Sequence, residues 1–242
     1  MKTGKLLPAA AELHAARRRH LTDDQLAMTH TIDETTYQRY LAALLAGDRA
    51  GCARVVQELV AAGAGLKDLY TDLFQRALYQ VGELWERQRI SVAVEHLATA
   101  ITERMLPLVQ AQVFSGPTRD RSIIIACVAD EYHQLGGRMI ADFCELRGWR
   151  GYFLGADTPL PDLLRMIAER RPTLLGLSLS IYFNLPALLK ALDAVSSAHP
   201  DLPVLVGGQA FRWGGLPALQ AYSNVFYIAS LDELEQQMLA YE

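Results

Sequence analysis

The second half of the chain alternates short, nearly continuous apolar runs with amphipathic segments, and this pattern constrains the fold more than any other feature. The apolar runs predict strands over residues 122–129, 151–154, 173–178, 204–206 and 225–228. The segments between them predict helices over residues 135–147, 160–171, 185–198, 217–221 and 231–241. Strands that are apolar on both sides and alternate with helices form a parallel sheet covered on both faces. We therefore predict a doubly wound, five-stranded α/β domain over residues 122–242.

The first half of the chain predicts a four-helix bundle over residues 33–114. Apolar residues recur there at three- and four-residue spacing in segments that begin near Asp33, Asp48, Leu66 and Ser91. Short glycine-containing breaks separate the segments, as expected for antiparallel neighbours in a bundle. Residues 1–32 are polar and are interpreted as an N-terminal arm. Residues 115–121 are polar, contain Gly and Pro, and are interpreted as a linker.

Composition narrows the classes of function. Hydrophobic residues make up 51% of the chain, charged residues 21%, and the net charge is -4. This balance does not favour a domain that binds nucleic acid by itself, because such domains carry a strongly basic face. No apolar run is long enough for a membrane span, and the N-terminus shows no signal-peptide pattern. The scattered Cys52, Cys127 and Cys144 are typical of reduced core thiols, so we expect a cytoplasmic protein.

One histidine follows the first predicted strand, in the string Glu131-Tyr132-His133-Gln134-Leu135-Gly136. Ligands of open α/β sheets bind at the carboxyl ends of the strands, where such loops lie. A histidine held there by a carboxylate two residues earlier can bind a metal from below, and glycine lets a bulky cofactor approach the backbone. Taken alone, the string is also compatible with an ordinary polar loop.

Small and polar residues follow the next three predicted strands as well. They are Asp157 and Thr158, then Ser178 and Ser180, then Gly207 and Gly208. The last four would leave a slot at the carboxyl edge of the sheet, into which a flat heteroaromatic group could insert beside the Ser178 hydroxyl. A tight turn between strand and helix is the alternative explanation of the glycine pair.

These strings together resemble the cobalamin-binding domain shared by methionine synthase, corrinoid methyl carriers, mutases and light-dependent regulators. The matching residues are Glu131-x-His133-x-x-Gly136, Ser178-Leu179-Ser180 and Gly207-Gly208. The resemblance implies a Rossmann-like fold in which His133 is the lower axial ligand of cobalt and Glu131 orients its imidazole. It also implies contacts to the cofactor from Tyr132, Gln134, Leu135, Asp157 and Thr158. The methyl carriers usually have Asp where this chain has Glu131, which counts against that subgroup.

The helical half contains Trp85, followed after nine residues by Glu95-His96. An interfacial tryptophan and an exposed Glu-His pair are the simplest explanation of these residues alone. In a bundle that precedes a cobalamin domain, however, they resemble the cap of the adenosylcobalamin-dependent photoreceptor regulators. The resemblance implies that Trp85 packs on the 5′-deoxyadenosyl group and Glu95 binds its ribose. It also implies that His96 takes the upper cobalt position after light breaks the cobalt–carbon bond.

We therefore expect a cobalamin-binding light sensor that lacks the MerR-type DNA-binding domain of those regulators and acts through a partner protein or by changing its own assembly. A corrinoid methyl carrier of a methyltransferase system is the enzymatic alternative. A cobalamin storage or chaperone module is a third class, which would bind several upper ligands equally. Some related light sensors also bind a bilin beside the cobalamin, and no residue of this chain decides for or against a second chromophore.

Overall fold

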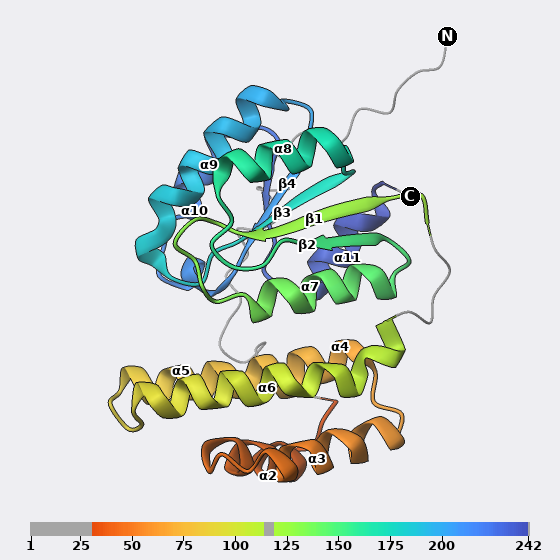
Figure 1. The fold of residues 1–242 in the computed structure, drawn as a ribbon, viewed down its shortest axis with the longest axis vertical. Helices are drawn as coiled ribbons and strands as arrows, with labels where there is room; N and C mark the ends of the chain where they lie inside the picture. The colour runs from red at the N-terminus through yellow and green to blue at the C-terminus, as the bar shows by residue number, and fades with distance from the viewer. Residues whose placement is uncertain (1–30, 114–118, 242) are drawn as a thin grey trace, which may run out of the picture. The chain divides into compact units, whose positions relative to one another are not determined.

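The computed structural model describes residues 31–113 and 119–241. Most of the predicted arm (1–32) and most of the predicted linker (115–121) therefore lie outside the described residues. Within the described part, the chain folds into a helical region followed by an α/β region, which confirms the predicted fold class (Figure 1). No helix among these residues is both long and apolar enough to cross a membrane.

The helical region contains the four predicted helical segments. Their bounds are α2 Glu34–Leu45, α3 Arg49–Ala61, the continuous run α4 Leu66–Asp68, η2 Leu69–Gln75 and α5 Arg76–Glu86, and α6 Val92–Val113. The side chain of Asp33 accepts a hydrogen bond from the Thr36 amide, and that of Asp48 accepts one from the Gly51 amide. These caps satisfy amides that lack a partner at a helix start, so α2 and α3 begin where the sequence predicts.

The third helical segment is not a regular α-helix throughout. Residues 69–75 form π-helical turns, whereas the sequence predicts one α-helix over 66–86. A π turn adds one residue per turn, and here it leaves both Tyr70 and Phe74 fully buried, with ring centroids 6.1 Å apart. Leu69 and Leu73 keep the four-residue spacing of an α-helix, which is why the apolar pattern does not reveal the change.

The α/β region is built on one sheet of five parallel strands in the order β2-β1-β3-β4-β5. The strands are β1 Ser122–Cys127, β2 Arg150–Phe153, β3 Leu174–Ser178, β4 Val204–Gly207 and β5 Val225–Tyr227. Strand β1 ends two residues earlier than predicted, because Cys127 is its last residue in register with β3, opposite Ser178. The carboxyl ends of β1, β3 and β4 therefore lie side by side at one edge of the sheet.

Helices cover both faces of the sheet, as the doubly wound prediction requires. Their bounds are α7 Leu135–Leu146, α8 Leu160–Arg170, α9 Leu185–Ala198, α10 Leu216–Leu219 and α11 Leu231–Leu239. Ile124 and Ala126 of β1 pack in one apolar cluster with α8, α9 and α10. Ile123 and Ile125 pack in another with α7 and α11. This alternation is the two-residue period of a strand buried on both faces.

Helix α7 packs against the bundle as well as against the sheet. Its residues Leu135 and Met139 belong to the apolar cluster of the bundle, whereas Phe143 packs under the sheet. The hydroxyl of Tyr70 donates a hydrogen bond to the Asp142 carboxylate, with 2.8 Å between the oxygens. Burial and the charge of Asp142 raise the pKa of Tyr70, so the phenol keeps the proton that it donates. One helix thus joins the two cores.

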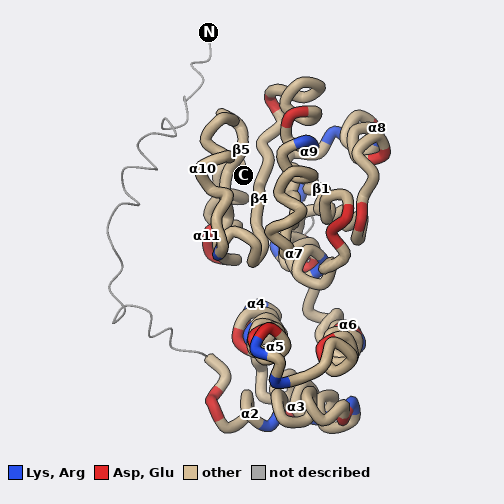
Figure 2. The backbone as a smooth tube through the Cα atoms, turned by 90° about the vertical axis from the view of Figure 1, so that its left-hand side faces the viewer, with Lys and Arg blue, Asp and Glu red and all other residues tan. Residues whose placement is uncertain are grey.

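Charged residues of both signs occur together along the bundle helices (Figure 2). Arg39 pairs with Glu58 at 2.8 Å and Arg76 pairs with Glu34, both at the surface. Solvent-exposed pairs of this kind contribute at most about 1 kcal/mol each. The stability of the bundle therefore rests on its apolar core rather than on these ion pairs.

The turn after β4 supplies a stability test. Gly208 has a φ of +118°, and a Cβ atom there would lie 2.1 Å from the Leu179 carbonyl oxygen. We expect Gly208→Ala to lower the free energy of unfolding by about 3 kcal/mol or more, because strain and overlap add. Gly82→Ala is the control, since no atom lies within 4 Å of the added Cβ; it should raise stability by about 0.5–1 kcal/mol. Equal urea midpoints for the two variants would contradict this account.

Candidate functional site

The loop that follows β1 is organised around one buried carboxylate, that of Glu131. Its Oε1 atom accepts hydrogen bonds from the backbone amide of His133 at 3.0 Å and from the Nδ1 atom of the same residue at 2.7 Å. Its Oε2 atom accepts bonds from the amides of Ser180 and Ile181 at 2.8 and 2.9 Å, and from the Asn184 side chain at 3.5 Å. Burial works against ionisation of Glu131, but these bonds outweigh it and lower its pKa.

His133 is held by that carboxylate in a defined orientation. Because Glu131 is ionised, the Nδ1 atom of His133 carries a hydrogen and donates it, so the lone pair of the neutral imidazole lies on Nε2. The side chain is 49% exposed, and among the described residues Nε2 has no hydrogen-bond partner. The bond to Glu131 raises the pKa of His133 against the opposing effect of burial. This is the carboxylate–histidine arrangement that orients metal ligands in proteins.

The start of α7 leaves room beside this imidazole. Apart from its chain neighbours and the backbone of its own helix, no atom lies within 4 Å of the position that a Cβ of Gly136 would occupy. Gln134 occupies the N-cap position of the helix without a capping side-chain hydrogen bond, and Leu135 is buried in the apolar cluster of the bundle. A single imidazole beside an open glycine backbone fits a metal that brings a macrocycle with it, because the macrocycle fills the other coordination positions. The residues present therefore fit a corrinoid cobalt centre.

Asp157 and Thr158 form hydrogen bonds that join the loop after β2 to the loop after β1. The amide of Asp157 donates to the Glu131 carbonyl at 2.9 Å, and its carboxylate accepts bonds from the Asp130 amide at 2.8 Å and the Tyr132 hydroxyl at 3.5 Å. Thr158 is buried, and its amide donates to the Cys127 carbonyl at 3.1 Å. These bonds tie the loop after β2 to the loop after β1, so both residues support the position of His133. Tyr132 itself is 67% exposed.

The glycine pair after β4 packs tightly against neighbouring backbone. A Cβ atom on Gly207 would lie 3.0 Å from the Ile228 carbonyl oxygen, and the position beside Gly208 is filled by the Leu179 backbone. The absent side chains thus allow the backbone segments that follow β3, β4 and β5 to approach closely. Ser178 is buried at the end of β3, and Ser180 contributes its amide to Glu131.

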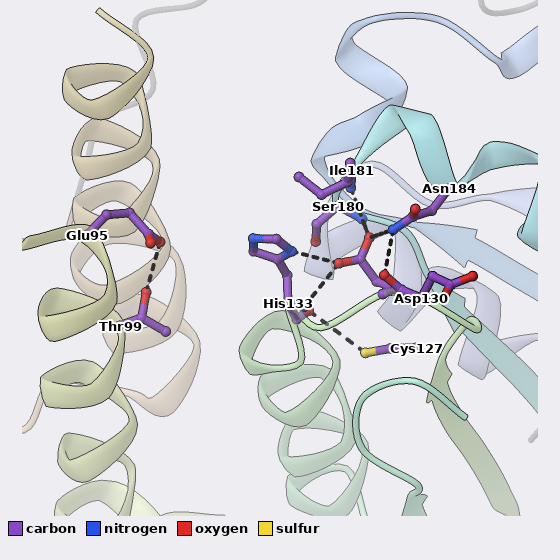
Figure 3. Close-up of polar contacts among 9 residues, drawn as sticks. Glu95, Thr99, Cys127, Asp130, His133, Ser180, Ile181 and Asn184 are labelled. Carbon is purple, nitrogen blue, oxygen red and sulfur yellow. Dashed lines mark hydrogen bonds and ion pairs between the residues drawn. The ribbon is translucent and has the colours of Figure 1, made fainter. Parts of the chain in front are cut away.

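The three predicted cap residues lie at one end of helices α5 and α6. Trp85 is in the last turn of α5 and is 45% exposed. Glu95 and His96 are in the first turns of α6, with 3.5 Å between Glu95 Oε2 and His96 Nε2. The charge of Glu95 also raises the pKa of His133. Figure 3 shows the Glu95 carboxylate and the His133 imidazole pointing toward each other from different elements.

Two residues of this site could not be predicted from any sequence motif. Asn184 donates to both the Asp130 carbonyl at 2.9 Å and the Glu131 carboxylate, yet it lies more than fifty residues away along the chain. Thr99 donates to Glu95 Oε1 at 3.2 Å from the next turn of α6. The first contact depends on the neighbouring positions of β1 and β3, and the second on a choice of side-chain conformer. Neither follows from a local motif.

Comparisons with known proteins agree with this geometry. Two B12 binding domain models match the chain, over residues 36–109 and 121–229. The HTH-type transcriptional repressor CarH of Myxococcus xanthus is 32% identical over 215 residues, which cover 87% of this chain and 69% of that protein. The repressor CarA of the same organism is 31% identical over 124 residues, 51% of this chain but only 43% of CarA.

A solved structure extends the comparison of folds. The monomethylamine corrinoid protein of Methanosarcina barkeri matches 87% of this chain and 100% of its own with a TM-score of 0.76 at 14% identity, which shows a shared fold. Fold and loop together define a cobalamin-binding protein in which a helical B12 binding domain precedes a Rossmann-like one. More particularly, the chain belongs to the B12-binding family that includes CarH, which confirms the resemblance drawn from the motifs.

Removal of the Glu131 carboxylate tests how the loop is held. Glu131→Ala leaves the amides of Ser180 and Ile181 without their partner, so the cofactor-free protein should lose about 2–4 kcal/mol of unfolding free energy at pH 7. A carboxyl group whose pKa is lower in the folded protein than in the unfolded chain stabilises the fold at any pH above its unfolded-state pKa. That stabilisation is lost as the pH falls through its folded-state pKa. The stability difference between wild type and variant should therefore grow as the pH falls from 7 to about 5.5, because protonated His133 is stabilised by Glu131 below its unfolded pKa of 6.5, and it should shrink below 4.5 as Glu131 is protonated.

Urea titrations of both proteins across this range measure the difference. His133→Ala is the matched control, because it keeps the two amide bonds to Oε2 and should cost less than Glu131→Ala. A difference that stays constant down to pH 3.5 would show that the ionised carboxylate does not hold the loop.

Proposed function

We propose that this protein is an adenosylcobalamin-dependent light sensor with a regulatory output. The observation that carries the proposal is the pairing of two groups: an oriented His133 on the α/β region and Glu95 on the bundle, each facing the other. One can hold a cofactor from below while the other contacts its upper ligand. The relatives CarH and CarA are transcriptional repressors by name, which supports a regulatory role rather than an enzymatic one.

The lower side of the site consists of His133 and its supports. When bound, adenosylcobalamin supplies a cobalt–carbon bond that visible light cleaves. His133 would present Nε2 as the lower axial ligand, and Glu131 would keep the imidazole in the tautomer that leaves this nitrogen free. The bonds from Ser180 and Ile181 keep Glu131 from turning away.

The upper side consists of Trp85, Glu95 and His96. The indole of Trp85 is sufficiently exposed to pack on a nucleoside, and the Glu95 carboxylate can accept hydrogen bonds from ribose hydroxyls. His96 is 75% exposed and lies next to Glu95, so its imidazole is free to approach the upper side of the site once the nucleoside leaves. These roles follow the resemblance to the photoreceptor regulators.

The output would come from a contact that exists in only one state. Trp85 would pack on the adenosyl group in the dark and would lose that contact after light, so the contact would stabilise only one arrangement of the bundle against the α/β region. The contacts between these regions include Tyr70 with Asp142 and Arg138 with Glu103 at 3.9 Å. We infer that their rearrangement changes the assembly of the protein or its binding to a partner.

A corrinoid methyl carrier is the second candidate, and the shared fold with the monomethylamine corrinoid protein is the observation that favours it. That likeness concerns the fold alone. A methyl carrier needs an upper side that opens toward a substrate, and it makes no use of a carboxylate that can bind ribose. The identity of the preferred upper ligand separates the two candidates.

Absorption spectra and size-exclusion chromatography before and after green light test the proposal. We expect the spectrum of the adenosylcobalamin-loaded protein to change to one that differs from that of photolysed free cofactor, together with a changed elution volume. His96→Ala should remove that spectral difference, whereas His199→Ala, a change at the end of α9, should leave it intact. Photolysis identical to that of free cofactor, with unchanged elution, would instead support the methyl-carrier candidate.

A further inference from the structure

The hydroxyl of Thr99 makes an uncommon choice of partner. Thr71 and Thr102, two other threonines of the bundle, donate to the backbone carbonyl four residues earlier, at 2.9 and 3.0 Å, and the Thr71 hydroxyl also lies 3.4 Å from the carboxylate of Asp72. Donation to that carbonyl is the usual arrangement for a threonine within a helix. Thr99 instead donates to the side-chain carboxylate of the residue four positions earlier, Glu95, at 3.2 Å (Figure 3). Its hydroxyl therefore restrains Glu95 and not the helix backbone.

The bond from Thr99 distinguishes the two oxygens of Glu95. Oε1 accepts the hydrogen bond from Thr99, whereas Oε2 lies 3.5 Å from Nε2 of the next residue, His96. The side chain is 21% exposed and sits in the first turn of α6, where the helix dipole favours a negative charge. One oxygen is thus anchored to the helix, and the other remains available to a group placed between α6 and His133.

Anchoring matters because a glutamate side chain has three rotatable bonds. Fixing such a side chain costs conformational entropy. A hydrogen bond that is present before the ligand arrives removes part of that cost from the binding step. The gain applies only to a ligand that donates to the carboxylate. An adenosyl group has ribose hydroxyls that can donate, and a methyl group has no such donor.

We propose that Thr99 is a positioning residue that fixes Glu95 for a hydroxyl-bearing upper ligand and thereby sets the preference of this protein for adenosylcobalamin over methylcobalamin. This inference rests on the proposed function, because it takes Glu95 to be a contact of the upper ligand. Thr99 acts only through Glu95 and has no contact of its own with the cofactor.

Titration of the full chain with adenosylcobalamin and with methylcobalamin, in the dark, tests the proposal. Thr99→Val removes the hydroxyl and keeps the branched shape; it should reduce the affinity ratio of the two cofactors by about three- to tenfold. The affinity for methylcobalamin should stay unchanged. Thr99→Ser keeps a hydroxyl and should restore the wild-type ratio, while Thr71→Val, whose hydroxyl bonds to backbone, should not change it.

The outcomes separate this inference from the proposed function. If the wild type binds both cofactors equally, the proposed function fails and the inference fails with it. If the wild type prefers adenosylcobalamin and Thr99→Val keeps the full preference, only the inference is overturned. Equal weakening of both cofactors in Thr99→Val would show a merely structural role and would also overturn it. Thr99 is only partly buried, and Thr99→Ala gives a second variant in which the hydroxyl is absent.

Discussion

The buried charge of Glu131 is the constraint on which the rest of the site depends. A carboxylate without water is costly to keep ionised unless hydrogen bonds surround it. Here the bonds come from His133 on its own loop and from the amides of Ser180 and Ile181 beyond β3. Those amides reach Glu131 because β3 lies next to β1 in the sheet. The strand order thus determines the charge state of Glu131, which in turn determines which nitrogen of His133 is free.

Helix α7 connects this site to the bundle. Its first residues follow the His133 loop, and its apolar residues pack in the bundle core on one side and under the sheet on the other. The hydrogen bond between Tyr70 and Asp142 adds a polar contact from the π-helical segment. A ligand held between His133 and Glu95 would therefore touch both regions. A change in the upper ligand would therefore alter the contacts between the two regions.

Much of the architecture could be predicted from the sequence because local patterns carry it. The caps at Asp33 and Asp48 and the apolar strands are short-range signals, and the structure has the helices and strands that they predict. The pairing of Glu131 with His133 also follows from two residues on one loop. The π-helical turns could not be predicted from the sequence, because the four-residue spacing of Leu69 and Leu73 fits an α-helix equally well.

The rest of the site depends on contacts between distant residues and on side-chain conformers. Asn184 reaches the Glu131 loop only because β1 and β3 are neighbours. Asp157 has the residue type of a ligand contact, but its carboxylate is occupied by the Asp130 amide and the Tyr132 hydroxyl. The need for glycine at position 208 comes from its backbone conformation and from the Leu179 backbone beside it, and the sequence pattern shows neither.

The central claim is that His133 binds cobalt through Nε2. Electron paramagnetic resonance of the protein loaded with cob(II)alamin, prepared with and without ¹⁵N-labelled histidine, tests this claim most directly. The account predicts that the splitting from the axial nitrogen changes from a triplet to a doublet when histidine is labelled, and that His133→Ala removes this change. A triplet that is insensitive to the label would mean that the cofactor keeps its own base, and it would contradict the account.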